Sequence, residues 1–213
     1  MLTHIYDVDG VLCNSEAFIA EAACQLFREQ YGIDVGTEDF APFIGSGEDR
    51  YLGGVAEKWG VALDLPRDKE RVYEIYARLV PGRMEPVPGV LSFIRRVREQ
   101  GGKQAVATSA DPVKLRANFA ALGLVPGDFN VCITGADVAY KKPAPDIFLK
   151  AAEACGAAPA TCVVFEDAVN GIQAAKAAGM RCVGIASYFE PAVLREAGAD
   201  EVWPHFERKE PWI

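Results

Sequence analysis

The chain has 213 residues, half of them hydrophobic and 24% charged, a balance typical of one or two folded domains with a buried core. Its 30 acidic and 22 basic residues give a net charge of −8, which argues against a nucleic-acid-binding surface, because such a surface concentrates positive charge. An anionic substrate is compatible with this total, because a local site can be positive or hold a metal.

The six cysteines form no C-x-x-C pair, and most lie in apolar runs such as "TCVVF" and "RCVGI". This pattern predicts reduced, buried thiols in a cytoplasmic protein. No apolar run approaches the roughly 18 residues that a membrane span needs. Met1 stands two residues before the first apolar run, so we expect no leader peptide and no membrane partner.

The first predicted element is a strand at residues 3–8, and residues 15–80 then follow a helical pattern. The run "SEAFIAEAACQLFREQYG" places its apolar side chains on one stripe and ends at Gly32. The runs "GEDRYLGGVAEKWG" and "RDKERVYEIYARLV" are also amphipathic, and nothing in this block has the pattern of a strand. We therefore expect a helical insertion after the first strand.

Prolines and glycines between residues 81 and 89 mark a boundary, after which helices and apolar strands alternate. The strands are predicted at 103–108, 129–134, 161–166, 181–186 and 200–203. Near-continuous apolar strands separated by helices are typical of a parallel sheet covered on both faces. The prediction is a doubly wound α/β core of residues 1–14 and 85–213 with a helical cap of residues 15–84.

Polar side chains gather at the carboxyl ends of these strands, where open α/β sheets bind ligands. They are Asp7, Asp9, Thr108, Ser109, Lys141, Lys142, Glu166 and Asp167. Four carboxylates cannot all ionise in a small space without compensation, and an all-oxygen ligand set indicates Mg²⁺. Hydroxyls and a lysine suit a phosphate that shares this ion.

Two carboxylates two residues apart can divide the work of phosphoryl transfer. Asp7 can attack phosphorus to form an aspartyl-phosphate, while Asp9 acts as general acid and then as general base. Simpler interpretations exist for the same residues. Asp7 and Asp9 can be turn residues, Thr108 and Ser109 a helix N-cap, and Glu166 and Asp167 capping acids.

Four motifs resemble those of the haloacid dehalogenase superfamily of phosphatases and phosphomutases. They are "DVDGVL", "AVATS", "KKPAPDIF" and "VVFEDAVNGIQAAKAAGM", in the order found in that family and spread over nearly the whole chain. The inserted helices resemble the small C1-type cap of the β-phosphoglucomutase-like and CbbY-like subgroup. The resemblance implies a Rossmann-like core and the same chemistry at the matching positions.

The resemblance assigns a role to each matching residue. Asp7 is implied as nucleophile, Asp9 as acid/base, Thr108 as phosphoryl holder with the backbone near Ser109, and Lys142 as the neutralising lysine. Magnesium is implied on Asp7, on the main-chain carbonyl of Asp9 and on Asp167, with Glu166 bound directly or through water. Asn170 either starts a helix or orients Asp167 or Lys142, and Ser109 and Asn170 are also expected to contact the substrate.

The cap run "FIGSGEDRYLGG" is where such enzymes contact their substrate, and it suggests Gly45, Glu48 and Arg50 as substrate-binding residues. Arg50 can equally be a surface charge. Ile19 stands about where β-phosphoglucomutases carry a cap histidine, and an isoleucine cannot move a proton. That departure favours hydrolysis over mutase chemistry.

We therefore predict a magnesium-dependent phosphohydrolase of a small phosphorylated metabolite, such as a sugar phosphate. One alternative is a sugar phosphomutase. The other is a non-catalytic regulatory module, but the complete set of acidic, lysine and hydroxyl residues argues against it. The tail "VWPHFERKEPWI" has two tryptophans, Trp203 and Trp212, which indicate either packing or a weak contact between copies. The expected state is a monomer or weak homodimer.

Overall fold

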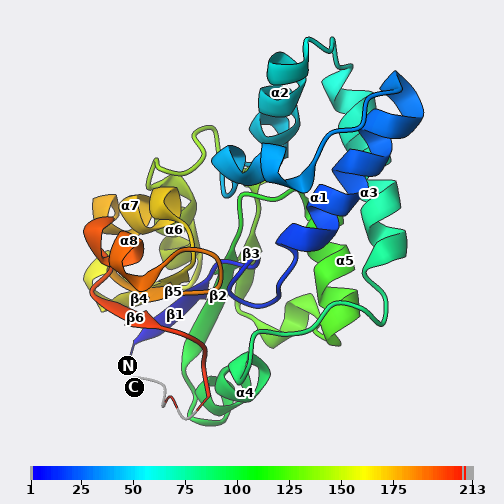
Figure 1. Cartoon of the computed structure of the whole chain (residues 1–213). Helices are drawn as coiled ribbons and strands as arrows, with labels where there is room; N and C mark the ends of the chain where they lie inside the picture. Colours follow the sequence, from blue (N-terminus) through cyan, green and yellow to red (C-terminus); the bar gives the residue numbers. More distant parts are fainter. Residues whose placement is uncertain (1, 208, 210–213) are drawn as a thin grey trace.

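The computed structural model describes residues 2–207 and 209, and a six-stranded parallel sheet lies at its centre (Figure 1). The strands run in the order β3-β2-β1-β4-β5-β6, and every neighbouring pair is parallel. Their bounds are β1 Thr3–Tyr6, β2 Lys103–Ala107, β3 Val131–Ile133, β4 Cys162–Glu166, β5 Arg181–Ile185 and β6 Glu201–Trp203. The order reverses at β1, which lies between β2 and β4, so the predicted doubly wound α/β fold is confirmed.

Helices connect the strands and cover the sheet. In the sheet region they are α4 Val90–Glu99, α5 Pro112–Leu122, α6 Asp146–Ala154, α7 Val169–Ala177 and α8 Pro191–Glu196. Short 3-10 turns lie at Pro126–Asp128, Gly135–Asp137 and Pro159–Thr161. Each predicted strand is present, but all are one to three residues shorter than predicted, because residues at one or both ends of each apolar run lie outside the ladder.

The two faces of β1 belong to separate apolar clusters. Tyr6 joins the cluster on one face, where its ring lies 5.1 Å from that of Phe165, and Ile5 joins the cluster on the other. His4 is also fully buried and stacks on Phe165 at 6.0 Å. A strand with no solvent-facing side must be apolar throughout, and this accounts for the unbroken apolar runs in the sequence.

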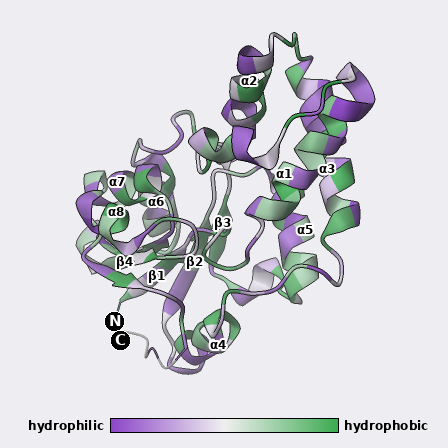
Figure 2. Ribbon diagram, viewed as in Figure 1, coloured by the Kyte–Doolittle hydropathy of each residue, from purple (hydrophilic) through white to green (hydrophobic). Residues whose placement is uncertain are grey.

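Residues 16–79 form helices above the carboxyl ends of the strands (Figure 1). The bounds are α1 Glu16–Leu26, a π-helical turn Phe27–Tyr31, a 3-10 helix Thr37–Phe43, α2 Glu48–Trp59 and α3 Leu65–Leu79. Gly32, at φ +67°, ends the first helix as predicted. The surface helices carry both hydrophilic and hydrophobic residues, as Figure 2 shows, and α3 packs its apolar side on α1 and α5.

Four of the six cysteines are fully buried, and all six are free thiols. Within the described residues, no helix is both long and apolar enough to cross a membrane. Of the two tail tryptophans, Trp203 is buried against Phe206, while Trp212 lies outside the described residues.

Candidate active site

The candidate site lies where β1, β2 and β4 end side by side. Asp7 directly follows β1, and its amide donates to the carbonyl of Phe165 at 3.0 Å. Thr108 directly follows β2, and Glu166 is the last residue of β4. Because parallel register aligns the three strands, these side chains meet at one edge, as the sequence predicted.

Lys142 links two of these carboxylates. Its Nζ donates to Asp7 Oδ1 and to Glu166 Oε1, both at 2.6 Å, and its side chain is only 3% exposed. Burial alone lowers the pKa of Lys142, but the charges of Asp7 and Glu166 outweigh it and raise that pKa above its ordinary value. The lysine is therefore a fixed positive charge beside Asp7, whereas Lys141 next to it is only half-buried.

Asp7 itself is buried among charges of both signs. Burial raises its pKa to about 7, the charge of Lys142 opposes the rise, and Glu166 and Asp9 add to it. Glu166 has both oxygens on protein donors, Lys142 Nζ and the Ala168 amide at 2.9 Å. Glu166 thereby orients Lys142, and its contact with a metal, directly or through water, stays a prediction.

Asp167 is the buried acid that lacks compensation. It is 6% exposed and makes no hydrogen bond or ion pair with any described residue. Burial raises its pKa well above the ordinary value, and Glu166 and Asp7 raise it further. Gly10, at φ +72°, leaves the room that Asp167 occupies, because a Cβ there would lie 1.9 Å from Oδ2.

This arrangement fits a divalent cation between Asp7 and Asp167. Among residues 2–207 and 209, no three histidine, cysteine or acidic side chains are grouped so that they could hold a metal alone. The set implied by the family needs only two side chains, Asp7 and Asp167, with the main-chain carbonyl of Asp9. Oxygen donors and an uncompensated carboxylate suit Mg²⁺, which keeps several of its waters.

Two hydroxyl side chains, those of Thr108 and Ser109, directly follow β2 and line the same pocket as Asp7. Thr108 Oγ1 accepts a hydrogen bond from the backbone amide of Ala110 at 3.1 Å. The hydroxyl proton of Thr108 is therefore free to be donated to a group in the pocket. Ser109 Oγ is buried without a partner among the described residues, although Ser109 lines the same pocket. A buried donor without an acceptor is costly, and a phosphate oxygen would satisfy it.

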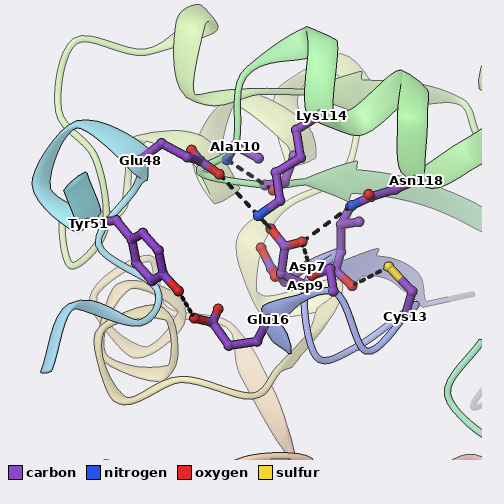
Figure 3. A network of polar contacts seen from close by, with 12 residues as sticks. Asp7, Asp9, Cys13, Glu16, Glu48, Tyr51, Ala110, Lys114 and Asn118 are labelled. Atoms are coloured by element: carbon purple, nitrogen blue, oxygen red, sulfur yellow. Dashed lines mark hydrogen bonds and ion pairs between the residues drawn. The ribbon is translucent and has the colours of Figure 1, made fainter. Parts of the chain in front are cut away.

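Asp9 is held by residues that the sequence analysis did not single out. Its carboxylate accepts from Lys114 Nζ at 3.0 Å and from Asn118 Nδ2 at 3.3 Å (Figure 3). Ser15 Oγ also donates to it. Lys114 is 4% exposed and also reaches Glu48 of the cap at 3.0 Å. The available signal was a lysine and an asparagine four residues apart on α5, one helical turn, so both face the same way.

The cap residues divide into those that reach the pocket and those that do not. Gly45 and Glu48 line it, as predicted. Arg50 does not: it pairs with the exposed Glu57 at 2.9 Å and stacks on the outer side of Phe43, so the expected substrate contact is replaced by a surface ion pair. Asn170 orients neither Asp167 nor Lys142, because its amide donates to the carbonyl of Gly45 at 2.6 Å and ties the cap to the core.

The family model for haloacid dehalogenase-like hydrolases matches residues 3–179. The chain belongs to this family of hydrolases. Its site residues lie at the sheet edge where the four motifs predicted them, and the crystal structure of CbbY from Rhodobacter sphaeroides in complex with phosphate superimposes with a TM-score of 0.87. That match is 27% identical and covers 98% of this chain and 96% of the other, which confirms the expected subgroup.

Two curated relatives are similar in sequence. A 197-residue stretch is 43% identical to the protein "Suppressor of quenching 1, chloroplastic" of Arabidopsis thaliana; this covers 91% of the chain but only 19% of that much longer protein. The fructose-1-phosphate phosphatase YqaB of Escherichia coli is 32% identical over 186 residues, with 85% of this chain and 94% of the relative covered.

Proposed function

We propose that this hydrolase is a magnesium-dependent phosphatase of a small sugar phosphate that works through an aspartyl-phosphate. The observation that carries the proposal is the buried carboxylate of Asp7, held at 2.6 Å by Lys142 next to the uncompensated Asp167. A phosphatase named for fructose 1-phosphate and a CbbY structure that holds phosphate are among the similar proteins, and both support this substrate class.

The chain's own residues account for the steps. Asp7 attacks phosphorus while Asp9 gives its proton to the leaving ester oxygen, so the P–O bond to the sugar breaks as the bond to Asp7 forms. Asp9 then takes a proton from water, which attacks the aspartyl-phosphate and releases inorganic phosphate. Lys142, Thr108 and Ser109 hold the phosphoryl oxygens in both steps.

Asp7, Asp167 and the main-chain carbonyl of Asp9 would hold magnesium, which would neutralise charge on the phosphoryl oxygens. Residues 15–84 act as the cap, which excludes bulk water from the pocket when closed. Within this proposal the protein is cytoplasmic, with reduced cysteines, and a monomer or weak homodimer.

Ile19 favours hydrolysis over the alternative of a sugar phosphomutase. It is 2% exposed, lines the pocket from α1 and cannot take or give a proton. A mutase must return the phosphoryl group to the sugar, whereas a phosphatase only needs water to reach Asp7. Assaying glucose 1-phosphate with a bisphosphate activator separates the two, since free phosphate indicates hydrolysis and the isomer indicates a mutase.

The nucleophile is tested with p-nitrophenyl phosphate and Mg²⁺. We expect Asp7→Asn to abolish release of p-nitrophenol, because an amide is a far weaker nucleophile than a carboxylate. Asp34→Asn is the matched control, since Asp34 is exposed and, among the residues that the structure describes, pairs only with Arg28 on the cap surface. Near-normal activity of Asp7→Asn contradicts the assignment.

The metal is tested without turnover. Because Mg²⁺ compensates Asp167 in the folded state alone, it should raise the melting temperature, by an amount equivalent to about 2.7 kcal/mol at 100 times its dissociation constant. Asp167→Asn should lose this rise in melting temperature. In a separate activity assay, excess chelator should abolish hydrolysis until Mg²⁺ is restored. An equal rise in the wild type and in Asp167→Asn contradicts the metal site.

A further inference from the structure

The charged residues of the pocket fall into two groups, each with three carboxylates and one lysine. The group at the strand ends contains three carboxylates and one lysine: Asp7, Glu166, Asp167 and Lys142. The group facing the cap also contains three carboxylates and one lysine: Asp9, Glu16, Glu48 and Lys114. In the proposed function a magnesium ion compensates the carboxylates of the first group. The second group has no such cation.

The single cation of the cap-facing group is already compensated. Lys114 Nζ lies 3.0 Å from Asp9 and 3.0 Å from Glu48, so one ammonium is shared by two carboxylates (Figure 3). Its side chain is 4% exposed, and that of Glu48 is 7% exposed, so water screens this pair little. Lys114 therefore has no spare charge for an incoming anion.

The third carboxylate of the group lies on the facing wall. Glu16 accepts from Tyr51 Oη at 2.5 Å, a neutral donor that leaves its charge in place (Figure 3). Tyr51 and Tyr188 also line this part of the pocket and bring hydroxyls only. Arg50 is turned outward to Glu57, so among the described lining residues the cap supplies no cation.

We propose that Glu48 and Glu16 restrict this enzyme to monophosphates whose remainder is an uncharged polyhydroxyl group, and that they exclude sugars with a second phosphate. The inference rests on the proposed function and assigns Glu48 as its specificity-determining residue. Sugar hydroxyls donate to the two carboxylates, while a second phosphate would face both of them in a poorly screened site whose one lysine is already shared by Asp9 and Glu48.

The test compares fructose 1-phosphate with fructose 1,6-bisphosphate, which differ only in the far phosphate. The wild type should show a kcat/KM for the monophosphate at least about tenfold higher, because like charges brought together in an interface are strongly disfavoured. Comparable values for the two sugars overturn the inference, and this comparison needs no variant.

The variant Glu48→Gln should lower the ratio of kcat/KM for the monophosphate to kcat/KM for the bisphosphate about tenfold, because Lys114 is then compensated by Asp9 alone. Asp49→Asn is the matched control: it removes the same charge from the same turn of α2, but Asp49 pairs with Lys69 outside the pocket. The control should keep the wild-type ratio within about twofold. An unchanged ratio in Glu48→Gln, or an equal change in both variants, overturns the inference.

If the melting temperature shows that Glu48→Gln fails to fold, Glu16→Gln provides an independent test. The ratio of kcat/KM values for the two sugars should fall in Glu16→Gln as well. Turnover of p-nitrophenyl phosphate separates the two levels of the proposal. If the wild type hydrolyses this ester, Asp7→Asn does not, and the bisphosphate is still as good a substrate as the monophosphate, only the specificity inference fails. If the wild type hydrolyses no phosphate ester with Mg²⁺ present, both fail.

Discussion

Replacing Lys114 with methionine tests whether its ammonium holds the cap-facing carboxylates together. Methionine keeps most of the length and volume of the stem but leaves Asp9 and Glu48 without their shared cation. Removing one partner of a buried ion pair costs about 3–5 kcal/mol, because a charge stays buried and uncompensated. Asp9 is 25% exposed and keeps Asn118 and Ser15 as donors, so the lower end of that range, about 3 kcal/mol, is expected.

The origin of this loss is resolved by a double-mutant cycle with Glu48→Gln. If the cost comes from the stranded carboxylate of Glu48, the double variant Lys114→Met/Glu48→Gln should be about 1–2 kcal/mol more stable than Lys114→Met alone. Urea unfolding followed by circular dichroism gives each free energy of unfolding. For a chain of this length 1 kcal/mol corresponds to a melting shift of roughly 2–4 °C. A loss below about 1 kcal/mol for Lys114→Met, or strictly additive effects, refutes the reasoning.

Three further changes have defined outcomes. Burial lowers the pKa of His4 to about 4, so folding favours its neutral form, and the stability that this gives above the unfolded pKa of 6.5 is lost as the pH falls towards 4. Between pH 7 and pH 5 the free energy of unfolding in urea should fall by about 2 kcal/mol. An equal fall in His4→Leu contradicts this assignment. Gly10→Ala would place a Cβ against Asp167 at a φ of +72°, so it should cost at least about 1 kcal/mol and remove the Mg²⁺-induced melting shift; an unaltered shift contradicts the crowding. Asn170→Ala loses the 2.6 Å bond to the Gly45 carbonyl, worth about 1 kcal/mol, and should raise KM for the sugar phosphate about fivefold with little change in the melting temperature; an unchanged KM means that this bond does not help to close the cap.

The sheet and the reacting end of the site could be predicted from the sequence because local signals encode both. Unbroken apolar runs such as that of β4 occur where a strand is buried on both faces. The position of Asp7 at the end of β1 then follows from the topology, since parallel strands bring their carboxyl ends to one edge. Lys142 was found by its motif, and its contacts with Asp7 and Glu166 agree with the proposed role.

The cap-facing end was predicted only in part: Glu48 was expected in the pocket, but its pairing with Lys114 was not, because that geometry depends on how two separately encoded units pack. Lys114 lies on a helix whose apolar pattern gives no reason to single out a lysine, and its partner Glu48 is 66 positions away in the chain. Arginine often binds phosphate, which is why Arg50 was predicted to contact the substrate. In the structure Arg50 lies on the outer face of α2 and pairs there with Glu57. Such choices are made by tertiary packing, which a single sequence does not display.

The most direct measurement is the mass of the protein after a single turnover of p-nitrophenyl phosphate with Mg²⁺, quenched in acid before the intermediate hydrolyses. The account predicts one added phosphoryl group, located by peptide mapping on Asp7 and missing in Asp7→Asn. Stoichiometric release of p-nitrophenol by the wild type, with no phosphoryl group on Asp7 at any quench time, would contradict it.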